Sequence, residues 1–191
     1  FPGAHVSVVG NIPQFTVMQQ YVERGQMWSM LLSVLVIGVI LILLFRSWKV
    51  GLVGMIPNIA PAIIVGGMMG WLGYPLDMMT ASLIPMVLGI AVDDTIHFIN
   101  HCHVAHNRYN DYNMAIRKTF RTEGLAIVMS TVIISATFAG FMSSDATQTK
   151  NWGLLAVAGM VSALLADLFL TPILLKYLRV FGKEKGSKTN S

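Results

Sequence analysis

Charged residues are scarce in this sequence. Only 12% of its 191 residues are Asp, Glu, Lys or Arg, whereas a soluble domain carries about 25%. Apolar residues make up 54% of the chain, and the mean hydropathy is +0.64. This composition is typical of a membrane protein. The net charge of +4 therefore does not indicate nucleic-acid binding, because basic residues beside apolar runs set membrane topology instead.

Cysteine is almost absent as well. The single Cys102 excludes an internal disulfide and says little about the cellular compartment. The sequence also lacks a nucleophile–base set, a phosphate-binding loop and a cofactor motif, which argues against an enzyme. Its first residues show neither a basic nor an apolar segment of a signal peptide. Since the sequence also opens without Met, we expect a piece of a longer protein.

Long apolar runs dominate what is present. Residues 27–45 contain no charge, and at 1.5 Å per residue they reach about 28 Å, enough to cross the hydrocarbon core. The second run carries Pro57, Pro61 and several glycines, which predicts a kinked helix packed inside a bundle. The sequence predicts an all-α membrane protein, a five-helix transmembrane bundle within residues 17–180, with spans at about 27–45, 50–72, 78–100, 124–142 and 152–175.

The segments outside these runs have their own signals. His5–Val9 is β-branched and precedes the turn pair Gly10-Asn11, so residues 1–16 are expected to be the last strand and end of an extracytoplasmic domain. Residues 17–26 can form a helical lead-in. Residues 101–123 are polar, and their second half predicts an amphipathic helix on the membrane surface. Residues 181–191 form a basic tail.

The basic residues are distributed unevenly between the two sides that five spans define. Of the 13 Lys and Arg residues, Arg24 and Lys150 fall on one side and the other eleven on the opposite side. Positively charged loops stay in the cytoplasm. We therefore expect residues 101–123 and the C-terminal tail in the cytoplasm, with the N-terminal strand outside.

Two adjacent carboxylates, Asp93 and Asp94, interrupt the third span. A charge in a membrane helix costs at least a few kcal/mol, roughly 2.5–3.5 on insertion scales, so such a residue indicates function by default. His97 follows at helical spacing from both carboxylates and can face either one. A structural pair held by hydrogen bonds in the bundle is the alternative reading.

The stretch Gly89-Ile-Ala-Val-Asp93-Asp94-Thr-Ile-His97-Phe98 resembles a signature of the resistance–nodulation–division (RND) superfamily. It is most similar to the branch of MmpL-type lipid exporters, hopanoid exporters and Patched-like proteins, which have Gly-x-x-x-Asp here. The order of Trp152–Leu155 and Ala166–Leu175 fits the same family. The resemblance implies helices eight to twelve of a twelve-helix transporter in a bacterial inner (plasma) membrane, with the N-terminal half missing; both monomers and homo-oligomers occur among such relatives.

The resemblance further implies an exporter of hydrophobic or lipid-like substrates that is driven by the proton-motive force, with protons as coupling ions and no cofactor. Asp93 is the first candidate for the proton relay and Asp94 the second. His97 would continue the relay, and Ser130 and Thr131 would supply hydroxyl links. The drug-efflux members pair their acidic residues with a lysine, and no expected span contains one. That departure favours the lipid-exporter branch.

Several alternatives stay open at this point. A sterol-sensing type of lipid receptor would use the same bundle without pumping, and an auxiliary subunit would supply half a transporter. Asp167, in the last span, either forms structural hydrogen bonds or joins the proton path. His97, His101, His103 and His106 with Cys102 look like a metal cluster, but their spacing matches no compact zinc pattern. We therefore interpret them as interfacial histidines and expect no metal.

Overall fold

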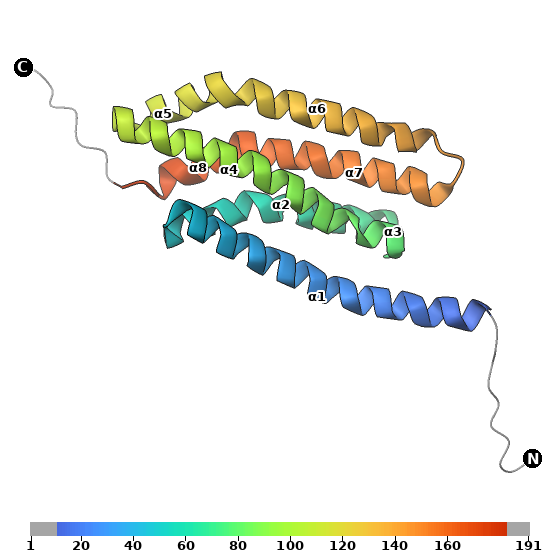
Figure 1. Ribbon diagram of the computed structural model, residues 1–191. Helices are drawn as coiled ribbons and strands as arrows, with labels where there is room; N and C mark the ends of the chain where they lie inside the picture. Colours follow the sequence, from blue (N-terminus) through green and yellow to red (C-terminus); the bar gives the residue numbers. More distant parts are fainter. Residues whose placement is uncertain (1–10, 183–191) are drawn as a thin grey trace, which may run out of the picture.

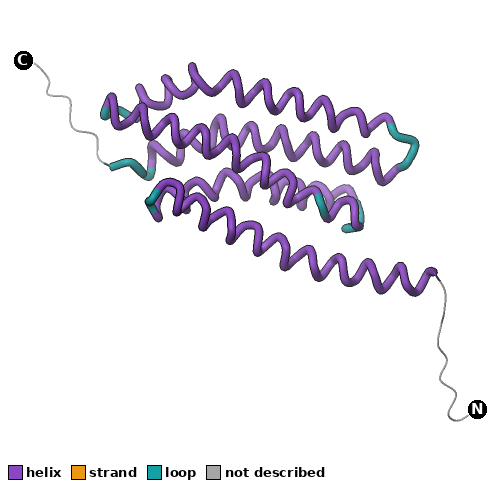
Figure 2. Tube along the Cα trace, in the orientation of Figure 1, coloured by secondary structure: helices purple, strands orange, loops and turns teal. Residues whose placement is uncertain are grey.

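The computed structural model describes residues 11–182, and this part of the chain folds into helices without strands (Figures 1 and 2). The α-helices are α1 Asn11–Phe45, α2 Trp48–Leu72, α3 Met78–Ala81, α4 Leu83–Tyr109, α5 Tyr112–Thr119, α6 Leu125–Ala139, α7 Thr147–Leu165 and α8 Thr171–Tyr177. Two π-helical segments, η1 Phe120–Gly124 and η3 Ala166–Leu170, and a 3-10 turn, η2 Gly140–Ser143, connect some of them.

Five helical segments are long and apolar enough to cross a membrane, which confirms the predicted all-α bundle. They are Trp28–Phe45, Trp48–Leu72, Met79–Tyr109, Tyr112–Ser143 and Thr147–Tyr177. Pro57 and Pro61 both lie buried inside the continuous helix α2. The expected strand at residues 5–9 lies outside the described residues, whereas residues 11–16 belong to α1. Pro13 is compatible with this because it stands in the first turn.

The third helix extends further than the sequence indicated. We predicted its end near residue 100, but α4 continues to Tyr109. The polar segment after residue 100 still buries Cys102, Ala105 and His106, which follow one another at helical spacing and face the bundle. Asn110 then ends the helix in a left-handed conformation at φ 52°. The helix α5 stands where the amphipathic helix was expected, but it continues through η1 into α6. Its placement on the membrane surface stays a prediction.

The bundle has inner and outer helices. In the most apolar parts of the spans that contain α2, α4 and α7, 56%, 44% and 50% of the residues are buried. The corresponding share is only 6% for the span in α1 and 11% for the span that contains α6. The two outer helices leave most of their apolar surface uncovered. In Figure 1, the α1–α2 connection, the α4–α5 turn and the end of α8 lie at the end of the bundle marked C. Most of the predicted cytoplasmic basic residues flank these three points.

Gly159 permits α7 to approach α2 and α4 closely. A Cβ atom at this position would lie 2.8 Å from Val87 Cγ2 and 3.0 Å from Val65 Cγ2. We therefore expect Gly159→Ala to lower the free energy of unfolding by about 1–3 kcal/mol, as overpacking does. Thermal unfolding in detergent measures this. Gly66→Ala is the matched control, since its added Cβ meets no atom within 4 Å; an equal loss in both variants would contradict the packing argument.

Candidate functional site

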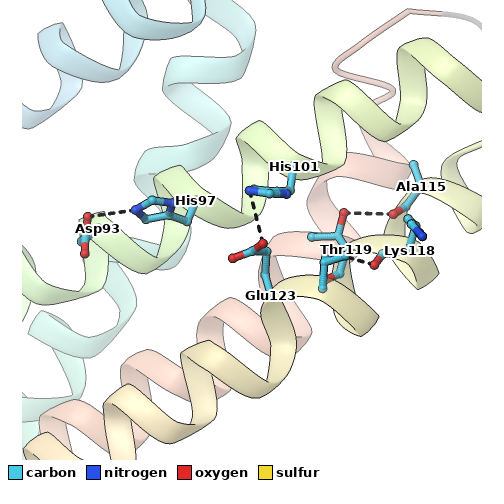
Figure 3. Close-up of polar contacts among 8 residues, drawn as sticks. Asp93, His97, His101, Ala115, Lys118, Thr119 and Glu123 are labelled. Carbon is cyan, nitrogen blue, oxygen red and sulfur yellow. Dashed lines mark hydrogen bonds and ion pairs between the residues drawn. The ribbon is translucent and has the colours of Figure 1, made fainter.

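One face of α4 carries a row of uncovered polar residues. Gly89, Asp93, His97 and His101 follow at four-residue intervals and so lie on the same helical face; we call these four residues the α4 stripe. The side chains of Asp93 and His97 are 77% and 59% exposed, and Asp93 Oδ1 lies 3.6 Å from His97 Nε2 (Figure 3). A Cβ at Gly89 would meet no atom within 4 Å. The stripe is thus open along its length.

The π-helical segment η1 adds an acidic residue to the end of this stripe. Its Glu123 places Oε1 3.2 Å from His101 Nε2, and Glu123 is the more buried of the two (Figure 3). Sequence reasoning missed this pair because His101 and Glu123 sit at opposite ends of a segment interpreted as a polar connection. The sequence does contain a signal for this pair, because Glu123 is an acidic residue directly before Gly124 and the apolar run that begins there.

A second polar group lies inside the bundle, and we call it the buried polar cluster. Its members are Asn58 on α2, Thr95 on α4, Asp167 on η3 and Thr171 on α8, all between 0% and 2% exposed. Thr95 Oγ1 lies 2.6 Å from Asp167 Oδ1 and 3.2 Å from Asn58 Oδ1. Thr171 Oγ1 lies 3.3 Å from Asp167 Oδ1. The cluster therefore joins α2 and α4 to the segment formed by η3 and α8.

The remaining predicted relay residues are placed differently. Asp94 is half-buried. In the sequence it lies between Asp93 of the α4 stripe and Thr95 of the buried polar cluster. The hydroxyls of Ser130 and Thr131 each donate to the carbonyl of Ile127 at 2.9 Å. Such bonds to the preceding turn are a common outcome for hydroxyls within helices. Within residues 11–182 neither hydroxyl bonds an acidic side chain, so their relay role stays a prediction.

The histidines beyond the α4 stripe pack against aromatic rings. The ring centroid of His103 lies 4.9 Å from that of Phe181, and the centroid of His106 lies 4.2 Å from that of Tyr112. Cys102 is buried. In the described part of the chain, no three His, Cys, Asp or Glu side chains come together as a metal would require.

Comparison with known proteins identifies the family of this bundle. The model of the MMPL family matches residues 1–189. The chain belongs to the MMPL family. This MMPL chain is 25% identical, over 174 residues, to a membrane protein of Methanocaldococcus jannaschii, a match that covers 91% of the chain and 45% of that protein. It is 26% identical, over 188 residues, to the hopanoid transporter HpnN of Burkholderia multivorans, covering 98% of the chain and 21% of the transporter.

These matches confirm the resemblance to the RND superfamily and its MMPL branch. Members of this family are transporters, and the five apolar helices make this MMPL chain a multi-pass membrane protein. The chain spans less than half the length of the curated relatives it matches. The α4 stripe contains Gly89, Asp93 and His97 of the stretch that resembles the family signature, and these three residues are exposed.

Proposed function

We propose that this chain is the transmembrane part of an exporter of hydrophobic or lipid-like substrates, driven by the proton-motive force, with Asp93 and Asp94 in the proton relay. The observation that carries the proposal is the uncovered Asp93–His97 pair within a membrane span. A carboxylate exposed to lipid is strongly unfavourable. Proton binding, a water-filled path or a partner must offset this cost in the assembled protein.

The α4 stripe supplies groups for a proton path. Asp93 lies near the middle of its span, and His97, His101 and Glu123 continue toward the α5 end of the bundle. The rise between His97 and His101 is about 6 Å, a gap that one water molecule can bridge. A histidine ring can accept a proton at one nitrogen and release one from the other. We infer that this path connects mid-membrane with the cytoplasm, in the orientation that the basic residues predict.

We propose that a second transmembrane half of the transporter packs against the α4 stripe and covers it. The chain spans only 45% and 21% of its two relatives, and the uncovered charges need a polar partner surface. Gly89 leaves space for a close helix–helix approach, as small residues do in membranes. A second copy of this chain is the alternative occupant, and it would make the exporter a homo-oligomer.

The proposed substrate class rests on the relatives. One of them is named a hopanoid transporter, which supports a lipid-like substrate. Titratable groups along α4 favour an exporter over a lipid receptor, because a receptor that does not pump has no need of a proton path. The direct test is export from cells that express the complete gene. We expect a protonophore to stop export of a hopanoid while ATP remains available, and export that persists would overturn proton coupling.

A larger side chain at Gly89 tests whether a second transmembrane half packs against the α4 stripe. We expect Gly89→Leu to reduce export to background, because the leucine would occupy the space where the partner approaches α4. The unfolding temperature and helical content of the chain should stay unchanged, since no described atom lies within 4 Å of the added Cβ. Gly66→Leu on α2 is the control, as its position is equally open. Full export by Gly89→Leu would contradict the packing of a second half against α4 at Gly89.

A further inference from the structure

If Asp167 is ionised, the buried polar cluster has more hydrogen-bond acceptors than its donors can satisfy. Its geometry begins with Asn58, which is fully buried. Asn58 Nδ2 donates to the carbonyl of Gly54 at 2.7 Å. This bond orients the side-chain amide, so the oxygen Oδ1 faces Thr95 Oγ1 at 3.2 Å. At this contact Asn58 can only accept a hydrogen bond.

Thr95 has one hydroxyl proton and two acceptor neighbours. Its Oγ1 lies 3.2 Å from Asn58 Oδ1 and 2.6 Å from Asp167 Oδ1. With an ionised Asp167, one of these two contacts joins oxygens that have no proton between them. A proton on Asp167 resolves this, because Asp167 then donates to Thr95 and Thr95 donates to Asn58. The hydroxyl of Thr171, 3.3 Å away, donates to the same carboxyl oxygen.

The second carboxyl oxygen of Asp167 points to the same protonation state. Oδ2 is buried and has no hydrogen-bond partner, and Asp167 is only 1% exposed. The ion pairs found in residues 11–182 use Asp93 and Glu123, so no cation there lies within 4 Å of Asp167. Asp94, which directly precedes Thr95 on α4, is also acidic and therefore offers no opposite charge. An unpaired carboxylate is strongly unfavourable in such a place.

The backbone at Asp167 departs from the regular α-helix. Asp167 lies in the π-helical segment η3, between α7 and α8. Single π turns inside helices are frequent at functional sites. Here Asp167 lies within hydrogen-bond distance of Thr95 on α4, and the segment η3 packs against both α2 and α4.

We propose that Asp167 holds a proton and that the buried polar cluster is a second proton-binding site, separate from the α4 stripe. When the O–H bond of Asp167 breaks, the proton passes to water, and the Thr95 hydroxyl turns to donate to the carboxylate. Asn58 Oδ1 then loses its donor. Proton loss thus removes the hydrogen bond between Thr95 of α4 and Asn58 of α2. It strengthens the hydrogen bond between Thr95 and Asp167 of η3. The role of this change in export rests on the proposed function, whereas the protonation does not.

Infrared spectroscopy of the intact protein in a detergent without ester groups tests the proposal directly. A protonated carboxyl has a C=O stretch that is separate from the carboxylate bands. At neutral pH we expect such a band in the parent protein, its loss in Asp167→Asn, and its retention in Asp93→Asn and in the loop control Asp145→Asn. A parent protein without the band, or an unchanged band in Asp167→Asn, would overturn the proposal.

Two further measurements test the hydrogen-bond geometry and the identity of the bound ion. Thr95→Val removes the acceptor of the proposed proton, so it should move the band to higher frequency; an unmoved band contradicts the geometry. Replacing choline chloride by sodium chloride at fixed pH should leave the band intact, and its loss would indicate a sodium site instead. If the band behaves as expected while export proves independent of protons, the proposed function fails and the protonation of Asp167 stands.

Discussion

Replacing Asp93 by Asn should reduce proton-driven export to the background of cells that lack the gene. Asparagine keeps the volume of the side chain and can still accept a hydrogen bond from His97 through its amide oxygen, but it neither binds nor releases a proton. The variant should insert and fold normally, because Asp93 is largely exposed and its described ion-pair partner, His97, is exposed as well. Export from cells that express the complete gene, normalised to the protein level in the membrane, measures the effect.

Two variants control the Asp93 result. Asp145→Asn makes the same chemical change in the exposed connection between η2 and α7 and should leave export unaltered. Asp94→Asn ranks the pair, and we expect a smaller loss because Asp94 is half-buried and lies off the α4 stripe. Parental export by both Asp93→Asn and Asp94→Asn would show that these carboxylates are structural. The proton site of the transporter would then lie elsewhere.

Replacing Thr95 by Val should cause the largest loss of stability in the bundle. The substitution keeps the shape of the side chain but removes the hydroxyl that joins Asn58 to Asp167. Both partners stay buried, and each polar group left without a partner costs about 1–3 kcal/mol. We therefore expect the free energy of unfolding to fall by roughly 2–6 kcal/mol, in a network where the losses are not additive. Denaturant unfolding in detergent measures this value.

Thr137→Val provides the matched control for Thr95. The hydroxyl of Thr137 is exposed and donates to the carbonyl of Ile133 on its own helix. Its loss should change stability by no more than about 0.5 kcal/mol, as is usual for surface positions. If the two valine variants unfold alike, the buried polar cluster does not link α2, α4 and η3, and its close distances have no energetic consequence.

The membrane spans could be predicted from the sequence because lipid imposes a simple rule. A crossing helix needs about 20 apolar residues, and each of the five predicted runs overlaps one of the five long apolar helical segments of the structure. The end of α4 could not be predicted in this way. Beyond residue 100 the helix is held by the buried faces of Cys102 and Ala105, and hydropathy does not distinguish such a polar but packed helix from a loop.

The candidate site was only partly predictable for a related reason. Asp93 and Asp94 are conspicuous because they stand within an apolar run, and helical spacing predicted that His97 could face either one. The structure pairs His97 with Asp93. Asn58 and Asp167 lie 37 and 72 positions from Thr95, so only tertiary packing brings this cluster together. In sequence, Thr95 is one of many hydroxyl residues of the spans, and nothing local distinguishes it.

The most direct test of the account is proton movement through the purified transporter. The complete protein is reconstituted in liposomes with a trapped pH-sensitive dye, and a pH gradient is imposed in the presence of a fluorescent polycyclic lipid. We predict that proton flux and lipid movement occur together in the parent protein and that both are absent in Asp93→Asn. Lipid movement without proton flux, or equal proton flux in both proteins, would contradict a proton relay at Asp93.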